Sequence, residues 1–497
     1  MNKKTLAVST FLTALLLACG PTSNGDQITL TYAAWNLQTA ELNNIERQMI
    51  AVYEEENPNI NIEVIERPVV VNEEGQEQDV GWEEFFATQA AVDNLPDVYM
   101  VYSIANFTTQ GWAEDVTDLV QADADFNLIP EDIQRSTAFG DQYFAIPQAL
   151  FYYGYFINRS AINRVGPRSV MPTYGMTFQE FMDAAEKNSK APIQGGDAII
   201  GVSGLDSLVN WLPAQMNPEL GWFTFNEETG YHLDGPEFET AVNEQLKYFG
   251  PGNSAYSSYV LEALNPSLYP DYFGVSSNVF ESGNQSMRWE GSFSMRNWFT
   301  RAANPTDSMY GMEIDFIGTP SWDADGVNVN KIPVVVDYIA LGKGTEHRQE
   351  AYDFAKWMGY GADAYAKRLE LAEANPLTAA LNFTPIVPRE DLIDGFFDLY
   401  PQMTEFKKIV SEHEDFILES VGKNVPGYWD SRQNAIFDVI QNDEGQDVNR
   451  SMGQAINDIC YGRLALADAL QQGLNTIANQ EWQEAKAALD AYINSLD

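Results

Sequence analysis

The feature that most constrains the fold is an alternation of strand-like and helix-like segments near the N-terminus. Residues 28–32 alternate apolar and polar side chains and favour a strand. Apolar residues at helical spacing predict a helix from Thr39 to Tyr53, which Pro58 ends, and residues 60–64 predict a second strand. A strand, a helix and a strand in this order are typical of a parallel sheet with helices on its faces.

The same alternation continues along the chain. Residues 97–101 and 332–341 favour buried strands, and Thr345 is expected to open a helix. Thr177 and Glu180 have the spacing of a capping box at a helix start. The region from about Tyr428 to the C-terminus is expected to be mostly helical. These segments predict an α/β fold.

The N-terminus has the pattern of a secretory signal. Lys3 and Lys4 precede an apolar run over 5–18 that is too short to span a bilayer. The run ends in Leu-Leu-Ala-Cys, which resembles a bacterial lipobox and implies cleavage before Cys19 with lipid on its thiol. Residues 1–18 are then a lipoprotein signal peptide and 19–27 an anchor and tether. The alternative is a signal peptide that happens to contain a cysteine.

Charge and cysteine content exclude several functions. The chain has 72 acidic and 28 basic residues, a net charge of −44, so nucleic acid and other anionic ligands are disfavoured. The acidic residues are dispersed, which indicates a solvated surface and is compatible with a saline habitat. Cys460 is the only cysteine besides Cys19, so no disulfide is expected.

Six segments, in order, resemble landmarks of carbohydrate-type extracellular solute-binding proteins (family 1) of ABC importers, which are related to maltose-binding protein. They are Asn57–Ile60, Pro96–Val98, Ala145–Pro147 with Tyr152–Asn158, Pro172 with Thr177–Phe181, Phe280–Met295 and Glu350–Met358. Phe178 and Phe293 stand where the family pattern has tryptophan.

The resemblance implies a periplasmic-binding-protein-like (type II) fold with two discontinuous lobes, hinge crossovers and a central ligand cleft. The expected crossovers lie near 146–150, 314–318 and 378–386. The expected lobes are 28–147 with 318–380, and 148–317 with 381–497. The resemblance also implies a monomer, lipid-anchored on the outer face of the cytoplasmic membrane, that captures a sugar by lobe closure and delivers it to the transmembrane subunits of an ABC permease.

Candidate ligand-binding residues follow from the chemistry of sugars. Aromatic rings cover the apolar faces of a sugar ring, and carboxylates and amides bind its hydroxyls. Such residues are expected where parallel strands end and near the crossovers, and the resemblance adds those around Gly291 and the late tryptophan. The candidates are Trp35, Asn36, Tyr102, Tyr152, Tyr153, Trp211, Trp289, Glu290, Phe293, Trp322, Asp337, Tyr338 and Trp429. For each, the alternative is ordinary packing. The number of aromatic candidates favours an oligosaccharide.

An enzyme is not expected. The chain has three histidines and none of the common metalloprotease, serine-hydrolase or phosphate-loop motifs. Paired carboxylates of a glycoside hydrolase remain an alternative, as does a surface glycan adhesin. No cofactor or metal is expected, although Asp123-x-Asp125-x-Asn127 and Asp323-x-Asp325-Gly326 are incomplete calcium loops that could equally be polar turns.

Overall fold

The fold is described from a computed structural model. It describes residues 27–37, 40–65, 69–71, 77–79, 81–190, 195–252, 259–324, 327–412, 416–418, 421–442 and 444–496. The predicted signal peptide, Cys19, Thr39 and the Asp325-Gly326 turn lie outside these residues.

One sheet runs through the molecule in the order β2-β1-β5-β16-β8-β12-β9, with β13 on β8 and β17 on β16. Its strands are β1 (Ile28–Ala33), β2 (Ile60–Ile65), β5 (Val98–Val101), β8 (Ile146–Asn158), β9 (Ile200–Ser203), β12 (Gln285–Gly291), β13 (Ile314–Phe316), β16 (Ile332–Leu341) and β17 (Phe416–Leu418). Strands β2, β1 and β5 are parallel, whereas β16 is antiparallel to both β5 and β8.

Five hairpins lie outside this sheet among the described residues. They are β3 (Val69–Val71) with β4 (Glu77–Asp79), β6 (Ala138–Phe139) with β7 (Gln142–Tyr143), β10 (Phe225–Asn226) with β11 (Gly230–Tyr231), β14 (Trp322–Ala324) with β15 (Val327–Val329), and β18 (Ile436–Gln441) with β19 (Asp447–Ser451).

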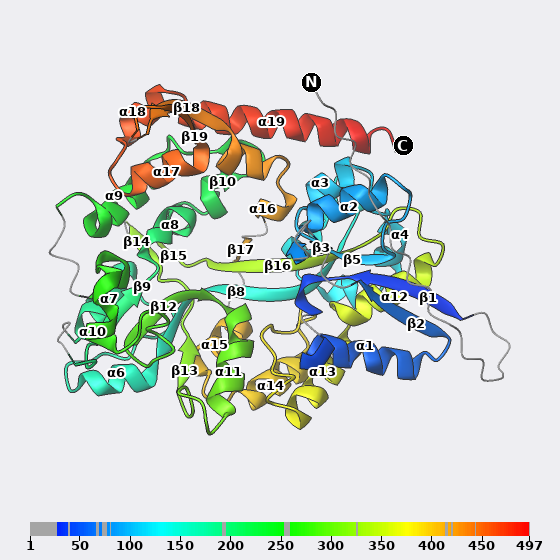
Figure 1. Cartoon of the computed structure of the whole chain (residues 1–497), viewed down its shortest axis with the longest axis horizontal. Helices are drawn as coiled ribbons and strands as arrows, with labels where there is room; N and C mark the ends of the chain where they lie inside the picture. The colour runs from blue at the N-terminus through cyan, green and yellow to red at the C-terminus, as the bar shows by residue number, and fades with distance from the viewer. Residues whose placement is uncertain are drawn as a thin grey trace.

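Helices surround the sheet on both sides (Figure 1). The first half of the chain has α1 (Ile45–Glu56), α2 (Trp82–Ala90), α3 (Ile104–Thr109), α4 (Thr117–Ala122), α5 (Glu131–Arg135), α6 (Arg159–Val165), α7 (Phe178–Lys187), α8 (Leu208–Met216) and α9 (Pro236–Phe249). The second half has α10 (Tyr269–Phe273), α11 (Met295–Ala303), α12 (Arg348–Met358), α13 (Ala362–Ala374), α14 (Glu390–Leu399), α15 (Thr404–Glu412), α16 (Val421–Asn424), α17 (Met452–Cys460), α18 (Leu466–Gln471) and α19 (Leu474–Ile493). None of the helices in the described part of the chain has the length and apolarity needed to cross a membrane.

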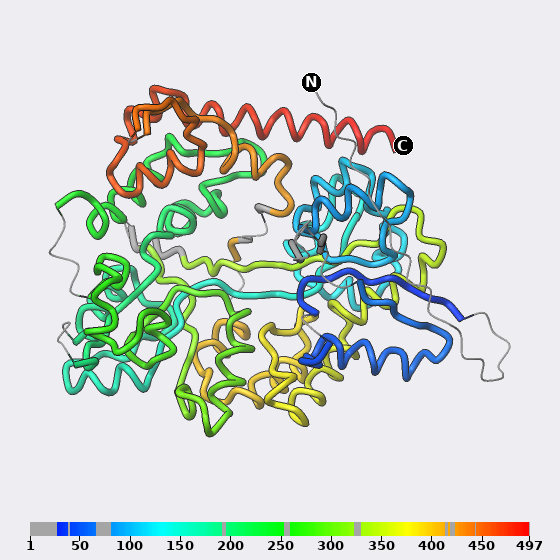
Figure 2. Tube along the Cα trace, viewed as in Figure 1, coloured from blue at the N-terminus to red at the C-terminus, as the bar shows by residue number. Residues whose placement is uncertain are grey.

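The long strands β8 and β16 join the two halves of the molecule, and Figure 2 shows them side by side across its centre. Strand β8 pairs with β16 up to Tyr152 and with β12 from Tyr153 onward. Just beyond, Gly154 lies against the backbone of Gly318, where an added Cβ would come within 2.7–2.8 Å of backbone atoms. A side chain at position 154 would therefore push β8 away from the segment that follows β13.

The buried side chains form two main cores. One packs around β1, β5, β16 and the first half of β8, and also takes in rings from α11, α14 and α15. The other packs around α8, α9, α17 and the start of α19. The C-terminal end of α19 reaches α3, where Tyr492 lies on Gly111, so this helix touches both halves.

Most predicted elements match the structure. The strands at 28–32, 60–64, 97–101 and 332–341 and the capping box at Thr177 are confirmed. Helix α1, however, begins at Ile45, because Asn44 is its N-cap and accepts from the Arg47 N–H. The helix expected at Thr345 begins at Arg348, and the threonine hydroxyl instead donates to Asp97. The β18–β19 hairpin interrupts the expected C-terminal helices.

Candidate functional site

Several predicted aromatic residues come together beside the centre of the molecule. The Trp289 ring lies on Trp211, with centroids 5.5 Å apart and planes 11° apart, and on Tyr153, with 5.8 Å and 19°. Phe293 meets the edge of Tyr153 at 5.7 Å. Trp222 lies 6.4 Å from Trp289, nearly parallel to it. We call these residues (Tyr153, Trp211, Trp222, Trp289 and Phe293) the aromatic wall.

Strand pairing positions the aromatic wall. Tyr153 is on β8 and pairs with Gly291, while Trp289 is two residues earlier on the antiparallel strand β12. Trp211 and Trp222 are buried, Tyr153 and Trp289 are half-buried, and Phe293 is 39% exposed. The outer members therefore present ring surface while the inner members support them.

A glycine and a buried carboxyl lie behind Trp289. Gly204 has φ +89°, and a Cβ there would come within 2.0 Å of the Trp289 Cβ, so only glycine fits. Its N–H donates to Glu262 Oε1 at 2.7 Å. Burial, reinforced by the nearby Asp206 carboxyl, raises the pKa of Glu262 to about 8. The carboxyl is therefore held in its neutral form at neutral pH.

The predicted carboxylates Glu290 and Asp337 are both half-buried and ion-paired. Glu290 binds Arg288 at 2.7 Å, and Asp337 binds Lys423 at 2.6 Å. Each carboxylate is thereby held in place by its partner, and carboxylates fixed in this way can accept hydrogen bonds from sugar hydroxyls.

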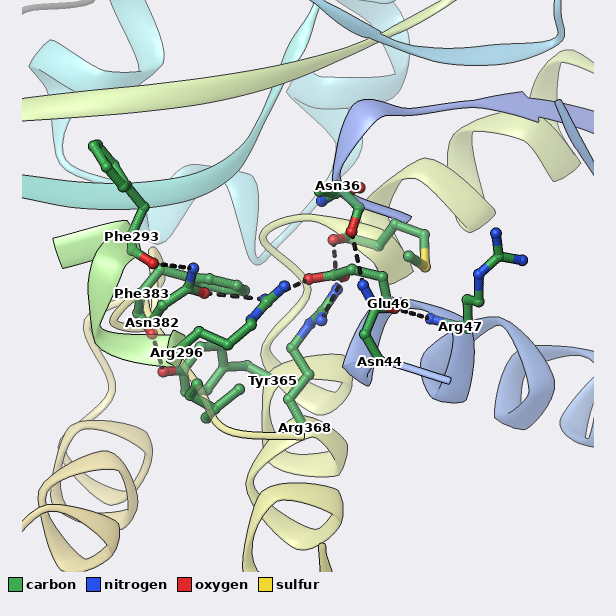
Figure 3. A network of polar contacts seen from close by, with 12 residues as sticks. Asn36, Asn44, Glu46, Arg47, Phe293, Arg296, Tyr365, Arg368, Asn382 and Phe383 are labelled. Carbon is green, nitrogen blue, oxygen red and sulfur yellow. Dashed lines mark hydrogen bonds and ion pairs between the residues drawn. The ribbon is translucent and has the colours of Figure 1, made fainter. Parts of the chain in front are cut away.

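A polar network links the loop after β1 to the aromatic wall (Figure 3). Asn44 donates to the backbone carbonyl of Asn36 at 2.8 Å. At the other end, the Asn382 side chain donates to the carbonyl of Phe293 at 3.1 Å and accepts from Arg296.

Glu46 is the centre of this network. Its carboxylate binds Arg296 at 3.0 Å and Arg368 at 2.8 Å, and Glu46 and Arg368 are fully buried. Burial alone would raise the pKa of Glu46, but the charges of Arg368 and Arg296 outweigh it and hold the pKa below its usual value. The network thus fixes α1, α11 and α13 relative to one another.

Four other predicted aromatic residues have no ring contact with the aromatic wall among the described residues. Trp35 and Trp429 are 37% and 47% exposed, and Tyr102 is half-buried against Phe107. Trp322 is half-buried against Phe178.

Two predicted tyrosines are core residues. Tyr152 packs between Phe316, Phe406 and Phe416, and burial raises its pKa to about 12. Tyr338 is fully buried and its hydroxyl donates to Ser136 at 2.9 Å. The burial of both rings favours a packing role.

Sequence reasoning missed Trp222. It follows Gly221 in a short 3-10 turn, η5 (Trp222–Thr224), in which Phe223 and Thr224 have φ values near +60°. A tryptophan next to a glycine outside any periodic segment was a usable signal. Its stacking on Trp289, however, depends on long-range packing.

The incomplete calcium loop at Asp123 has another partner. Lys356 binds Asp123 at 2.8 Å and Asp125 at 3.2 Å, and the Tyr360 hydroxyl donates to Asp123. Among the described residues, no group of three or more His, Cys, Asp or Glu could hold a metal ion. Cys460, the cysteine within the described range, is buried and unpaired.

A cavity of about 510 Å³ lies under α19, between residues 135–140 and the side chains of Phe225 and Trp482. None of the predicted ligand-binding residues lines it. Trp482 and Phe225 are almost buried and meet edge-on, so these two rings offer little free surface to the cavity.

Solved structures with the same fold cover almost the whole chain. An ABC substrate-binding protein from Listeria monocytogenes, in complex with cycloalternan, is 15% identical with a TM-score of 0.61, and the match covers 92% of this chain and 99% of that one. A sugar transporter structure from Rhizobium etli in an open conformation is 14% identical with a TM-score of 0.62, covering 91% and 99%. A cyclo/maltodextrin-binding protein complexed with maltotetraose is 15% identical with a TM-score of 0.58, covering 93% and 98%.

A comparison with curated proteins finds none that matches the chain. The model of the bacterial extracellular solute-binding protein family, by contrast, matches residues 38–359, well over half of the chain. Members of this family are binding proteins of transporters and not enzymes. The α/β architecture agrees with this match, and the chain belongs to the bacterial extracellular solute-binding protein family.

Proposed function

We propose that the chain is the carbohydrate receptor of an ABC importer. The observation that carries this proposal is the aromatic wall, whose half-buried Tyr153 and Trp289 rings lie beside the strands that join the two halves of the molecule. Parallel rings suit the apolar faces of sugars, and the fixed carboxylates of Glu290 and Asp337 suit their hydroxyls. The structural neighbours bound to cycloalternan and maltotetraose support a sugar as the ligand.

The finer parts of the proposal rest on the sequence. The lipobox supports an anchor at Cys19 on the outer face of the cytoplasmic membrane, and the number of aromatic candidates supports an oligosaccharide. Closure of the two lobes around the sugar would give the transmembrane subunits of the permease a signal, because the ligand binds the closed form better than the open form. The predicted lobe boundaries, 28–147 with 318–380 and 148–317 with 381–497, remain part of this proposal.

Tryptophan fluorescence of the purified protein tests the proposal. Maltotetraose, mannobiose and chitin oligosaccharides are titrated separately, since a sugar on Trp289 changes its surroundings. A saturable fluorescence change with one of these sugars in the wild type supports binding at the aromatic wall if it is lost in Trp289→Ala and kept in Trp357→Phe. Trp357 is a suitable control because it packs on Tyr53, against the other core. A saturable fluorescence change that persists in Trp289→Ala would show that the sugar binds away from the aromatic wall.

A further inference from the structure

A pocket behind the aromatic wall contains a buried cation that has no counter-charge among the described residues. Arg432 is 3% exposed and lines a pocket of about 180 Å³ between α8, α9 and α17. Its Nη2 reaches Asn210 Oδ1 only at 3.5 Å, and its Nε has no partner among the described residues. A buried charge is costly unless it is paired.

The other buried arginines in the described part of the chain show what is missing. Arg368 binds Glu46, and Arg450 binds both Asp438 and Asp458. Arg432 has no carboxylate within ion-pair distance among the described residues and instead stacks on the Phe223 ring at 5.1 Å. The Nε–Nη2 edge of its guanidinium is the part that binds carboxylates through two parallel hydrogen bonds.

A second unpartnered group lines the same pocket. Gln245 is fully buried and its Nε2 donates to the Asp206 carbonyl at 3.0 Å, which leaves Oε1 without a partner among the described residues. Oε1 can accept a hydrogen bond from a ligand hydroxyl. Asp206 also lines the pocket, and its side chain is exposed to solvent.

The backbone that holds Arg432 in this position is unusual. Phe223, on which the guanidinium stacks, has φ +59°, and the next residue, Thr224, has φ +60°. Such conformations are unfavourable for residues other than glycine and cluster at binding sites. Phe223 also packs on Tyr428, with ring centroids 5.1 Å apart.

We propose that this pocket binds a small hydroxycarboxylate, whose carboxylate pairs with the Arg432 guanidinium and whose hydroxyl donates to Gln245. The pocket of about 180 Å³ suits a small molecule such as lactate, which has six non-hydrogen atoms. The chain's net charge of −44 does not prevent this binding, because exposed charges are screened over about 8 Å at physiological salt. The pocket is separate from the aromatic wall, so this proposal does not depend on whether the wall binds a sugar.

Calorimetric titration of the purified full chain with L-lactate tests the proposal, with lactamide as the neutral analogue. The expected result is saturable 1:1 binding of lactate, at least tenfold weaker binding of lactamide, and at least tenfold loss in Arg432→Gln. Arg463→Gln is the matched control, because Arg463 borders the adjoining depression but binds Asp458 at 2.7 Å, and its lactate affinity should change less than twofold. Equal affinity in Arg432→Gln, or no lactate binding to the wild type at 50 mM, would overturn the proposal.

Cys460 gives a readout that needs no variant. Its buried thiol lines the pocket, so a bound carboxylate should shield it. Lactate is expected to slow modification of Cys460 by a thiol reagent severalfold, followed by peptide mass spectrometry, whereas lactamide should not. Equal modification rates in lactate and lactamide would count against the proposal even if Arg432→Gln failed to fold.

Discussion

Trp429 is the most exposed of the predicted ligand-binding residues, at 47%, and its one ring contact among the described residues is with the edge of Tyr428 at 5.2 Å. Trp429→Ala should therefore weaken sugar binding about tenfold, equivalent to about 1.4 kcal/mol, and change the free energy of unfolding by no more than about 0.5 kcal/mol. Sugar titration and chemical denaturation measure the two quantities. Tyr310→Ala, which removes a 59% exposed ring, is the control. Unchanged sugar affinity would remove Trp429 from the site.

Glu262 offers a second test at this scale, because its burial behind Gly204 makes stability depend on pH. Its pKa of about 8 in the folded state lies above the ordinary value of a glutamate, so the folded state holds a proton that the unfolded state releases. The wild type should lose stability as pH rises from about 4.5 to about 8, with no further loss from this group above that. Glu262→Gln keeps the acceptor for the Gly204 N–H and removes the charge.

Glu262→Gln should thus equal the wild type near pH 4 and be more stable by up to about 5 kcal/mol at pH 9, since each pKa unit corresponds to about 1.4 kcal/mol. Urea denaturation of both proteins at pH 4, 7 and 9 measures the difference. A constant difference across this range would show that Glu262 ionises normally.

Residue types at strand ends were predictable from the sequence, but their partners were not. Asn36 was named from its position after a predicted strand, whereas Glu290 and Phe293 were named from the family resemblance around Gly291. The stacking of Trp289 between Trp211 and Tyr153 arises from segments far apart in the chain, and local patterns do not encode such contacts.

Among the elements, α1, α11 and α13 depend on one buried carboxylate. Glu46→Gln would leave Arg368 and Arg296 without a full counter-charge, and breaking a buried pair costs about 3–5 kcal/mol. We expect a loss of about 3 kcal/mol in the free energy of unfolding at pH 7, measured by urea denaturation. Glu56→Gln, at the exposed end of the same helix, should have little effect.

The pH dependence of this loss has a defined sign. The pKa of Glu46 in the folded state lies below its ordinary value, so its stabilisation is present above that value and is lost as pH falls through the lower, folded-state pKa. The difference between wild type and Glu46→Gln should therefore shrink in acid. A difference that grew in acid would exclude the ion pairs as its source.

Element types followed the periodicity of the chain where burial was regular. The strands at 28–32 and 332–341 are buried in the sheet and had the expected patterns. The β18–β19 hairpin was missed although Asn442 and Gly445 form a turn, because Ile436 and Val439 are exposed and Phe437 is the one residue of β18 that is buried in a core. Exposed apolar residues give no core pattern to detect.

At the scale of the whole molecule, two halves share one sheet through β8 and β16, and α19 touches both (Figure 1). The family resemblance predicted a two-lobe architecture joined by crossovers. The contact between the C-terminal helix α19 and α3 could not be predicted from the sequence, because it depends on how the two halves are placed relative to each other.

The most direct test of the receptor proposal is a thermal-shift screen of the purified protein against mono- and oligosaccharides. A ligand that binds only the folded state stabilises it by about 2.7 kcal/mol at 100 times its Kd. The account predicts a clear rise in Tm with at least one oligosaccharide, reduced in Trp289→Ala. No shift with any sugar, together with a shift from peptides or metal ions, would leave the fold unchanged and contradict the carbohydrate assignment.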